Sequence, residues 1–205
     1  MSSISIIGLG SMARTLAELA LAGGHAVEVI GRDPAKAEEI GAALGATTGT
    51  FGATPAGDIV ILAVPHEGGV AVVSQYGDAL AGKVVVDISN TFAGADDTNL
   101  VTPEGTSGAQ QIAAALPASA HVVKAFNTVF GHVLARGGQL DVFFAGDDPA
   151  AKASVAAFIE SLGLRPLDVG GLEMAHWLEG AGLLMMGLAR SGAGFDIALG
   201  AELLG

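Results

Sequence analysis

Short apolar runs and amphipathic segments alternate along this chain. The apolar runs are rich in β-branched residues and predict buried strands over residues 4–7, 26–30, 58–64, 83–87 and 121–124, with a short further strand over 47–51. Segments with helical spacing lie between them, over residues 12–22, 34–44, 69–80 and 110–116. This alternation predicts an α/β protein with a doubly wound parallel sheet of the Rossmann type.

The pattern repeats once more, in a shorter form, beyond residue 136. It predicts a strand over 141–145, a helix over 149–162, a strand over 165–169 and an apolar helix over about 172–189. We therefore expect a Rossmann domain over residues 1–136 and a small C-terminal α/β lobe over 137–205, which ends in the apolar helix and completes a groove. Apolar side chains surround most of that helix, which indicates burial either within the chain or in a homodimer interface. Both interpretations stay open.

A glycine-rich loop joins the first predicted strand to the first predicted helix. Gly8 permits a tight turn, Gly10 lets the backbone approach a pyrophosphate, and the small Ala13 lets the helix pack closely on the strand. The start of the helix offers unpaired N–H groups and about half a positive charge. We expect this loop to bind a dinucleotide through Gly8, Leu9, Gly10, Ser11 and Met12.

The end of the second strand indicates which dinucleotide is bound. An NAD enzyme places an acidic residue there, on the ribose hydroxyl, whereas this chain has Gly31 and Arg32, with Lys36 one helical turn further on. A guanidinium can hold a 2′-phosphate with its forked N–H groups, which favours NADP. The alternative is that Arg32 pairs with a carboxylate at a helix start, since Asp33 and Pro34 form a helix-start signal.

The remaining strands end at the same edge of a parallel sheet, so their terminal turns should converge on one groove. The further cofactor contacts expected there come from Ala63, Val64, Pro65, Asn90 and Ala125, and the groove-lining candidates near the reacting groups are His66, Asn127 and Val129.

Several of these side chains have more than one interpretation. His66 can contact the nicotinamide or the acceptor, or act as an acid or base. Asn90 and Asn127 can orient a carboxamide or the acceptor, or cap turns. Lys124 can neutralise an anionic ligand or form a structural salt bridge.

Composition narrows the class of protein. The formal net charge of −12 argues against nucleic acid or an anionic membrane as a partner. The absence of cysteine excludes disulfides and thiolate chemistry, and the five histidines show no paired metal-ligand spacing, so no metal site is expected. The chain enters a strand without a signal-like segment and has no convincing membrane span, so we expect a cytoplasmic protein.

The residue types also exclude common reductase mechanisms. Short-chain dehydrogenases need a lysine four residues after a tyrosine, but Leu80 stands at that spacing from Tyr76, the only tyrosine. What remains is chemistry that the cofactor itself can perform, such as hydride transfer between two stacked rings in a dry groove.

Four motifs make the chain similar to the NADPH-dependent reductases of the deazaflavin coenzyme F420 and to the wider group of small NADP-binding oxidoreductases. These motifs are Ile7 to Ala13, Ile30-Gly31-Arg32 with Lys36, Val123 to Val129, and Gly163 to Gly170. The resemblance implies NADPH across Leu9 to Met12, its 2′-phosphate on Arg32 and Lys36, and the deazaflavin near Val129. It also implies that Val64 and Pro65 lie near the adenosine or nicotinamide half of the dinucleotide, and that the protein is a dimer.

We therefore expect an oxidoreductase that transfers a hydride between NADP(H) and coenzyme F420, with a small molecule as acceptor. The alternatives are an NADPH-dependent reductase of another flavin, a quinone or an imine, and a non-catalytic module that senses NADP(H). The sequence leaves open whether the loop over residues 92–108 closes over the site.

Overall fold

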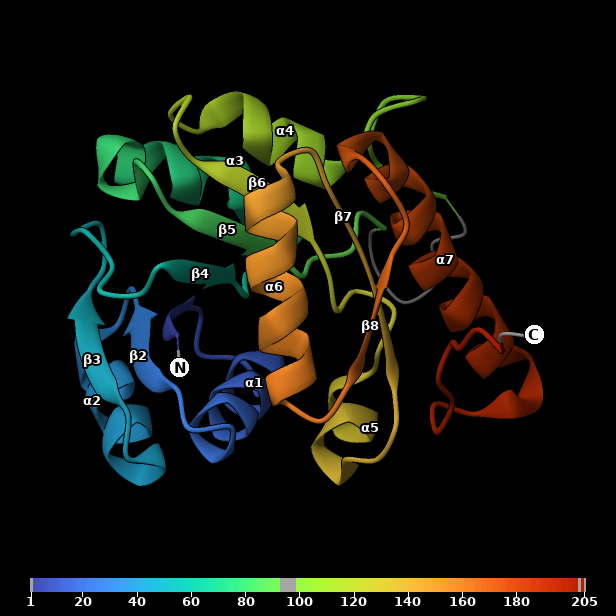
Figure 1. The fold of residues 1–205 in the computed structure, drawn as a ribbon, viewed down its shortest axis with the longest axis horizontal. Helices are drawn as coiled ribbons and strands as arrows, with labels where there is room; N and C mark the ends of the chain where they lie inside the picture. Colours follow the sequence, from blue (N-terminus) through green and yellow to red (C-terminus); the bar gives the residue numbers. More distant parts are fainter. Residues whose placement is uncertain (1, 93–98, 203, 205) are drawn as a thin grey trace.

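In the computed structural model, which describes residues 2–92, 99–202 and 204, the described chain forms one eight-stranded sheet (Figure 1). The strand order across the sheet is β3-β2-β1-β4-β5-β6-β7-β8. The strands are β1 (Ser3–Ile7), β2 (Ala26–Gly31), β3 (Thr47–Thr50), β4 (Ile59–Leu62), β5 (Val84–Asp87), β6 (His121–Lys124), β7 (Asp141–Gly146) and β8 (Arg165–Asp168).

The first six strands are parallel, as predicted for a Rossmann fold. Ile7 at the end of β1 pairs in register with Ile30 of β2 on one side and with Leu62 of β4 on the other. The strand order therefore reverses between β1 and β4, and the crevice beyond the carboxyl ends of these two strands is where such sheets bind ligands. The glycine loop follows β1 at this point.

Helices cover both faces of the sheet. The bounds are α1 (Ser11–Ala22), α2 (Pro34–Leu44), α3 (His66–Tyr76), α4 (Gly108–Ala115), α5 (Gly131–Arg136), α6 (Pro149–Ser161) and α7 (Ala175–Leu188), with 3₁₀ turns at Gly77–Leu80 and Leu172–Met174 and a π-helical turn at Ala189–Ala193. One apolar cluster joins α1 and α6 to the sheet, and a second joins α3 and α4 to the opposite face (Figure 1). The sheet is therefore the middle layer of three.

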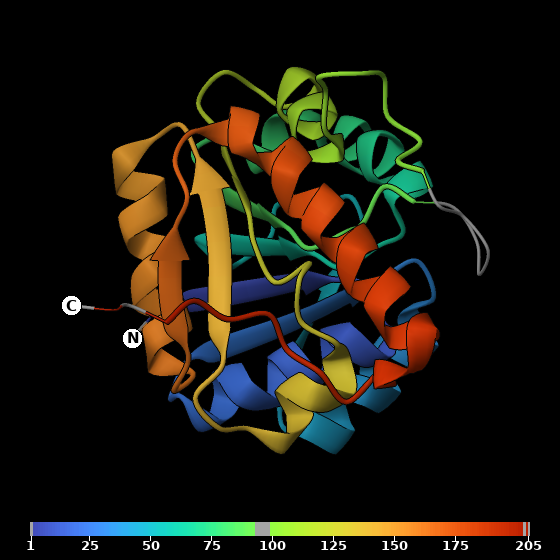
Figure 2. The ribbon, with the colours of Figure 1, turned by 90° about the vertical axis from the view of Figure 1, so that its right-hand side faces the viewer.

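The last two strands depart from the predicted parallel pattern. β7 pairs antiparallel to β6, with Lys124 opposite Ala145 and Val123 opposite Gly146, whereas β8 is again parallel to β7. A parallel return needs a crossover that carries the chain back to the starting edge, but α5 is a six-residue helix packed against α1 and provides none. β7 therefore begins beyond the carboxyl end of β6, and β7 and β8 run steeply across the other strands (Figures 1 and 2).

The predicted boundary at residue 136 coincides with the end of α5. β7 and β8 nevertheless continue the sheet of the first six strands, and the division into two domains stays a prediction.

The last helix, α7, crosses in front of the carboxyl edge of the sheet (Figure 2). Its inner face is buried through Ala175, Leu178, Glu179, Gly182 and Met185. Its outer face exposes apolar side chains, with exposed fractions of 66% for Trp177, 70% for Leu184 and 51% for Leu188. The helix is thus buried on one side only. Within the described chain, no helix is long and apolar enough to cross a membrane.

Candidate functional site

Gly8 directly follows β1 and packs against Ala63, the residue after β4. Its φ angle is +139°, its N–H donates to the Ile30 carbonyl at 2.9 Å, and a Cβ added to it would lie 2.1 Å from the Ala63 carbonyl oxygen. Only glycine fits this position without moving backbone. Gly10 differs, because a Cβ there would meet no atom within 4 Å.

The start of α1 has the properties of an anion-binding helix terminus. Gly10 is its N-cap residue and has no side chain to satisfy the first N–H groups, and no acidic residue lies in the first turn. Unpaired N–H groups and the positive end of the helix dipole both favour a bound phosphate.

A cavity of about 620 Å³ opens beside this loop. It brings together nine of the predicted cofactor-binding residues: Gly8, Leu9, Gly10, Gly31, Arg32, Lys36, Ala63, Val64 and Pro65. Phe51, Gly68, Ala71 and Gln75 also line it and were not predicted, because Phe51 follows a short polar strand and the others lie inside α3, where no motif marks them.

Arg32 and Lys36 lie at one end of this cavity, and Arg32 also lines an adjoining cavity of about 420 Å³. Asp33 caps α2, where its carboxylate accepts from the Lys36 backbone N–H at 3.2 Å, and Pro34 follows as the first helical residue. Within the described part of the chain, neither cation forms an ion pair within 4.0 Å. The alternative pairing of Arg32 with a carboxylate is therefore not seen, and both cations stay available to an anionic ligand.

The lack of a side chain at Gly31 leaves room for Leu9 in the cavity wall. A Cβ added to Gly31 would lie 2.4 Å from the Leu9 Cδ1 atom, so the side chain of Leu9 fills the space that any other residue at position 31 would need. NAD enzymes have an acidic residue at this strand end. Here the strand end is Gly31, and the Leu9 side chain of the glycine loop packs against it.

A smaller cavity of about 200 Å³ is lined by Met12 of α1 and by residues that do not line the first cavity. The lining includes Met12, Asn90, Asn127 and Val129 from the predicted set, together with Ile88, Phe126, Thr128, Phe130, Gly131, Gly182, Met185 and Met186. Most of these side chains are apolar, as a site for a flat ring requires.

Asn127 is held firmly in the wall of this smaller cavity. Its Nδ2 donates to the Leu178 carbonyl at 2.7 Å and to Asn90 Oδ1 at 3.0 Å, and Asn90 Nδ2 donates back to the Asn127 carbonyl at 3.1 Å. Phe126 makes this turn possible with a φ angle of +62°, a conformation that non-glycine residues adopt only at a cost of about 1–3 kcal/mol.

Two buried oxygens of the same turn have no hydrogen-bond partner among the described residues. They are Asn127 Oδ1 and Thr128 Oγ1, and their side chains are almost fully buried. Because unpartnered buried polar atoms are rare, these oxygens are suited to a polar group of a bound ligand, such as a carboxamide. A dinucleotide therefore fits this edge of the sheet: phosphates at the glycine loop, a 2′-phosphate at Arg32, and a polar ring substituent at Asn127.

His66 is the first residue of α3 and is not among the lining residues of either cavity, and its place in the groove stays a prediction. Its Nδ1 atom packs against Gly108, where an added Cβ would lie 2.7 Å away, and has no partner among the described residues.

Two further predicted residues also lie outside the linings of both cavities in the described structure. Ser11 is exposed at the start of α1, and Ala125 is fully buried in the core beside β5. The loop over 92–108 was considered as a segment that closes over the site, but residues 93–98 of it lie outside the described residues.

Three ionised side chains meet in the interior behind the smaller cavity. Lys124 Nζ lies 2.8 Å from Asp87 Oδ2 and 2.9 Å from Glu179 Oε1, and all three side chains are fully buried. Lys124 Nζ also donates to the Ser89 carbonyl at 2.6 Å. Lys124 therefore forms a structural salt bridge, one of its two interpretations. Glu179 was not predicted as a site residue, because a single acid in an apolar helix gives no signal of what it pairs with.

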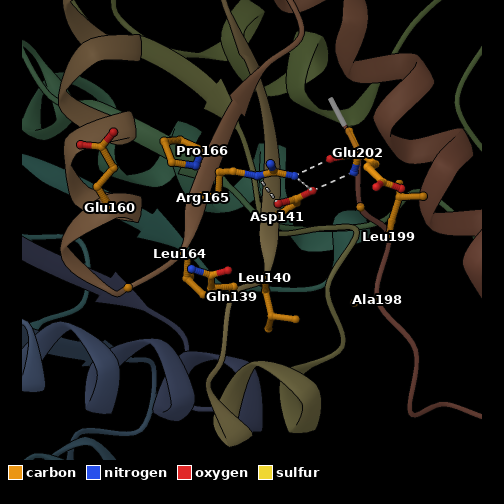
Figure 3. A pocket seen from close by; sticks show the side chains of 13 residues that line it. Gln139, Leu140, Asp141, Glu160, Leu164, Arg165, Pro166, Ala198, Leu199 and Glu202 are labelled. Carbon is orange, nitrogen blue, oxygen red and sulfur yellow. Dashed lines mark hydrogen bonds and ion pairs between the residues drawn. The ribbon is translucent and has the colours of Figure 1, made fainter. Parts of the chain in front are cut away.

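A further cavity of about 950 Å³ lies away from the glycine loop, between the β7–β8 edge and the C-terminal segment (Figure 3). Arg165 donates twice to the Asp141 carboxylate at 2.6 Å, and the Ala201 N–H donates to the same carboxylate at 2.7 Å. The Arg165 guanidinium holds the pKa of the Asp141 carboxyl below its usual range. The pair ties the C-terminal segment to the sheet.

Comparison with known proteins relates the chain to one class of oxidoreductase. Residues 3–91 match the family model described as NADP oxidoreductase coenzyme F420-dependent, so this part of the chain is similar to that NADP oxidoreductase family. These residues contain the glycine loop, Arg32, Lys36 and the turns after β4 and β5.

Individual relatives agree with this assignment. The chain is 33% identical to an F420-dependent NADP reductase from Methanocaldococcus jannaschii over 139 residues, covering 64% of this chain and 62% of that protein. It is 31% identical over 186 residues to the rat metalloreductase STEAP3, covering 89% of this chain and 37% of that protein. The structure of a proposed F420-dependent NADP reductase from Arthrobacter sp. FB24 superposes with a TM-score of 0.82 at 28% identity, covering 93% and 95% of the two chains.

The chain thus spans 37% and 62% of the length of the two curated relatives. The resemblance expected from the sequence motifs is confirmed at the level of the family and the fold.

Proposed function

We propose that this protein transfers a hydride between NADP(H) and the deazaflavin coenzyme F420. The observation that carries the proposal is a pair of cavities lined from the glycine loop and the start of α1. One is lined by the glycine loop, Arg32 and Lys36, and neither cation forms an ion pair among the described residues. The other is lined by apolar side chains and contains two oxygens without a partner among those residues. A reductase of this kind needs two ligand sites that adjoin each other.

The larger cavity is the proposed NADP(H) site. The N–H groups at the start of α1 would hold the pyrophosphate, Arg32 and Lys36 the 2′-phosphate, and Ala63, Val64 and Pro65 would lie along the dinucleotide. Met12 and Asn90, the other predicted cofactor contacts that line a cavity, belong to the smaller one, where the nicotinamide end would lie. When bound, NADPH supplies two electrons and a proton to the acceptor as a hydride and leaves as NADP⁺.

The smaller cavity is the proposed site where the acceptor ring meets the nicotinamide. Val129, Met12 and Met185 exclude water from it, and Asn127 is oriented by the Leu178 carbonyl so that its Oδ1 atom is free to accept from a ligand. No acid or base is required of the protein in this scheme, and His66 would serve as a packing residue against Gly108.

We further propose that the protein is a cytoplasmic homodimer. The exposed apolar face of α7, formed by Trp177, Leu184 and Leu188, supports the dimer, because an apolar stripe of this kind is suited to burial against another copy. Sedimentation of the purified chain would test it.

An acceptor panel tests the proposed function. Steady-state NADPH oxidation is measured with coenzyme F420, flavin mononucleotide, a quinone and a cyclic imine, and repeated with NADH. The proposal predicts turnover with F420 and NADPH well above every other combination. Faster turnover with another acceptor would reassign the substrate, and tight NADPH binding without turnover would indicate a sensing module.

A further inference from the structure

The interior cluster of Lys124, Asp87 and Glu179 joins elements that are far apart in the sequence. Glu179 belongs to α7, Asp87 ends β5, and Lys124 ends β6. The Glu179 carboxylate accepts from the Lys124 ammonium at 2.9 Å, from the Thr91 hydroxyl at 2.7 Å and from the Gly108 N–H at 3.0 Å. Because Gly108 is the first residue of α4, one side chain of α7 is bonded to a strand end, a loop and a helix start.

The charges make this attachment specific. Two carboxylates and one ammonium, all fully buried, carry a formal charge of −1, and no member can lose its partners without leaving an uncompensated buried charge or donor. The attachment therefore holds α7 in one position relative to β5 and β6, rather than allowing it to slide along an apolar surface.

The next turns of α7 lead from Glu179 to the smaller cavity. The Leu178 carbonyl accepts from Asn127, and Gly182 packs so closely on Asn90 that an added Cβ would lie 2.5 Å from its Oδ1 atom. Met185 and Met186 then form part of the cavity wall. The outer face of α7 is exposed and so contributes little to holding the helix (Figure 2). The bonds of Glu179 on the inner face therefore help to fix the position of this wall.

We propose that Glu179 is a positioning residue for the acceptor side of the site. Its carboxylate fixes α7 on the strand ends and thereby sets the wall that Gly182, Met185 and Met186 present to the acceptor. The cavity that would hold the phosphates of NADP(H) shares no lining residue with this wall. The inference rests on the proposed function for the identity of the acceptor, but the placement of α7 can be measured without any acceptor.

The experiment compares Glu179→Ala with the conservative Glu179→Gln and with Glu173→Gln, a matched control because Glu173 is exposed just before α7. Hydrogen exchange of the peptides over residues 172–189 reports the attachment of α7, and the peptides over residues 26–44 report the rest of the fold. The NADPH dissociation constant is measured by titration, and the KM for coenzyme F420 by steady-state kinetics.

In Glu179→Ala, the α7 peptides should exchange about tenfold faster or more, because hydrogen bonds to a charged group are lost, and the KM for F420 should rise by a similar factor. The NADPH dissociation constant and the exchange of residues 26–44 should stay within about twofold of the wild type, the range expected for a site that is not coupled. Glu179→Gln keeps one of the two acceptor oxygens and loses the charge, so both changes should be smaller than in Glu179→Ala, and the control should show neither change.

Unchanged exchange of α7 in Glu179→Ala would overturn the proposal, and so would an NADPH affinity that falls together with the acceptor affinity, because both would show that the cluster does not position this wall selectively. A wild-type protein that fails to reduce F420 would instead disprove the proposed function, and the exchange and NADPH measurements would still decide the role of Glu179.

Discussion

Gly8 and the Ala63 carbonyl approach each other so closely that a Cβ on Gly8 would lie 2.1 Å from the carbonyl oxygen. The contact joins the glycine loop to the end of β4, across the point where the strand order reverses. The first glycine of the loop therefore serves the packing of the fold, whereas the second, which has open space beside it, is proposed to serve the ligand.

This division predicts opposite results for two alanine substitutions. Gly8→Ala should destabilise the fold by about 2–4 kcal/mol, because the residue has a φ angle of +139° and its Cβ would collide with backbone. The measurement is the free energy of unfolding in urea.

Gly10→Ala is the matched variant. Its Cβ enters open space, so the free energy of unfolding should change by less than about 0.5 kcal/mol. NADPH affinity should nevertheless fall, because a methyl group would stand where the pyrophosphate is proposed to lie. Equal loss of stability in the two variants would contradict the distinct roles.

Arg32→Ala should weaken NADPH binding and leave NADH binding unchanged. Loss of a charge-assisted contact to the 2′-phosphate costs about 1.5–3 kcal/mol, which corresponds to a tenfold or larger rise in the NADPH dissociation constant. Arg190→Ala, an exposed cation in the C-terminal turn, is the control. A fall in NADPH affinity of less than threefold would refute the assignment of Arg32.

Lys124→Met should destabilise the protein by about 3–5 kcal/mol, because it leaves the buried carboxylates of Asp87 and Glu179 without their shared cation. Lys83→Met, which removes a lysine with no ion pair among the described residues, should have a much smaller effect. Urea denaturation of both variants measures the difference, and equal stability would show that the cluster contributes nothing.

The Asp141–Arg165 pair should make the attachment of the C-terminal segment sensitive to acid. The pKa of Asp141 is lowered in the fold, chiefly by the hydrogen bond from Arg165, so its contribution to stability is present above the ordinary carboxyl pKa and is lost as the pH falls below about 4, through the lowered value. Asp141→Asn should therefore be less stable than the wild type at pH 7, and the gap should narrow below pH 4. The exposed Asp78→Asn is the control, and a gap independent of pH would contradict the assignment.

The sequence predicted those parts of the structure that local patterns determine. The carboxyl ends of parallel strands meet at one edge, so the turns at Gly8, Arg32 and Pro65 could be assigned to one cavity before their distances were known. The direction of β7 could not be predicted, because strand periodicity is the same in both directions and the short α5 carries no clear signal. The partnership of Glu179 with Lys124 and Asp87 joins residues far apart in the sequence, and it depends on where α7 packs.

The most direct test of the account is single-turnover hydride transfer from NADPH to oxidised coenzyme F420, followed optically, with NADH and flavin mononucleotide as controls. We predict rapid bleaching of F420 with NADPH alone, and its loss in Arg32→Ala at NADPH concentrations that saturate the wild type. NADPH binding without bleaching would contradict the proposed reaction, leave the NADP(H) site in place, and direct the search to another acceptor for the cavity beside Asn127.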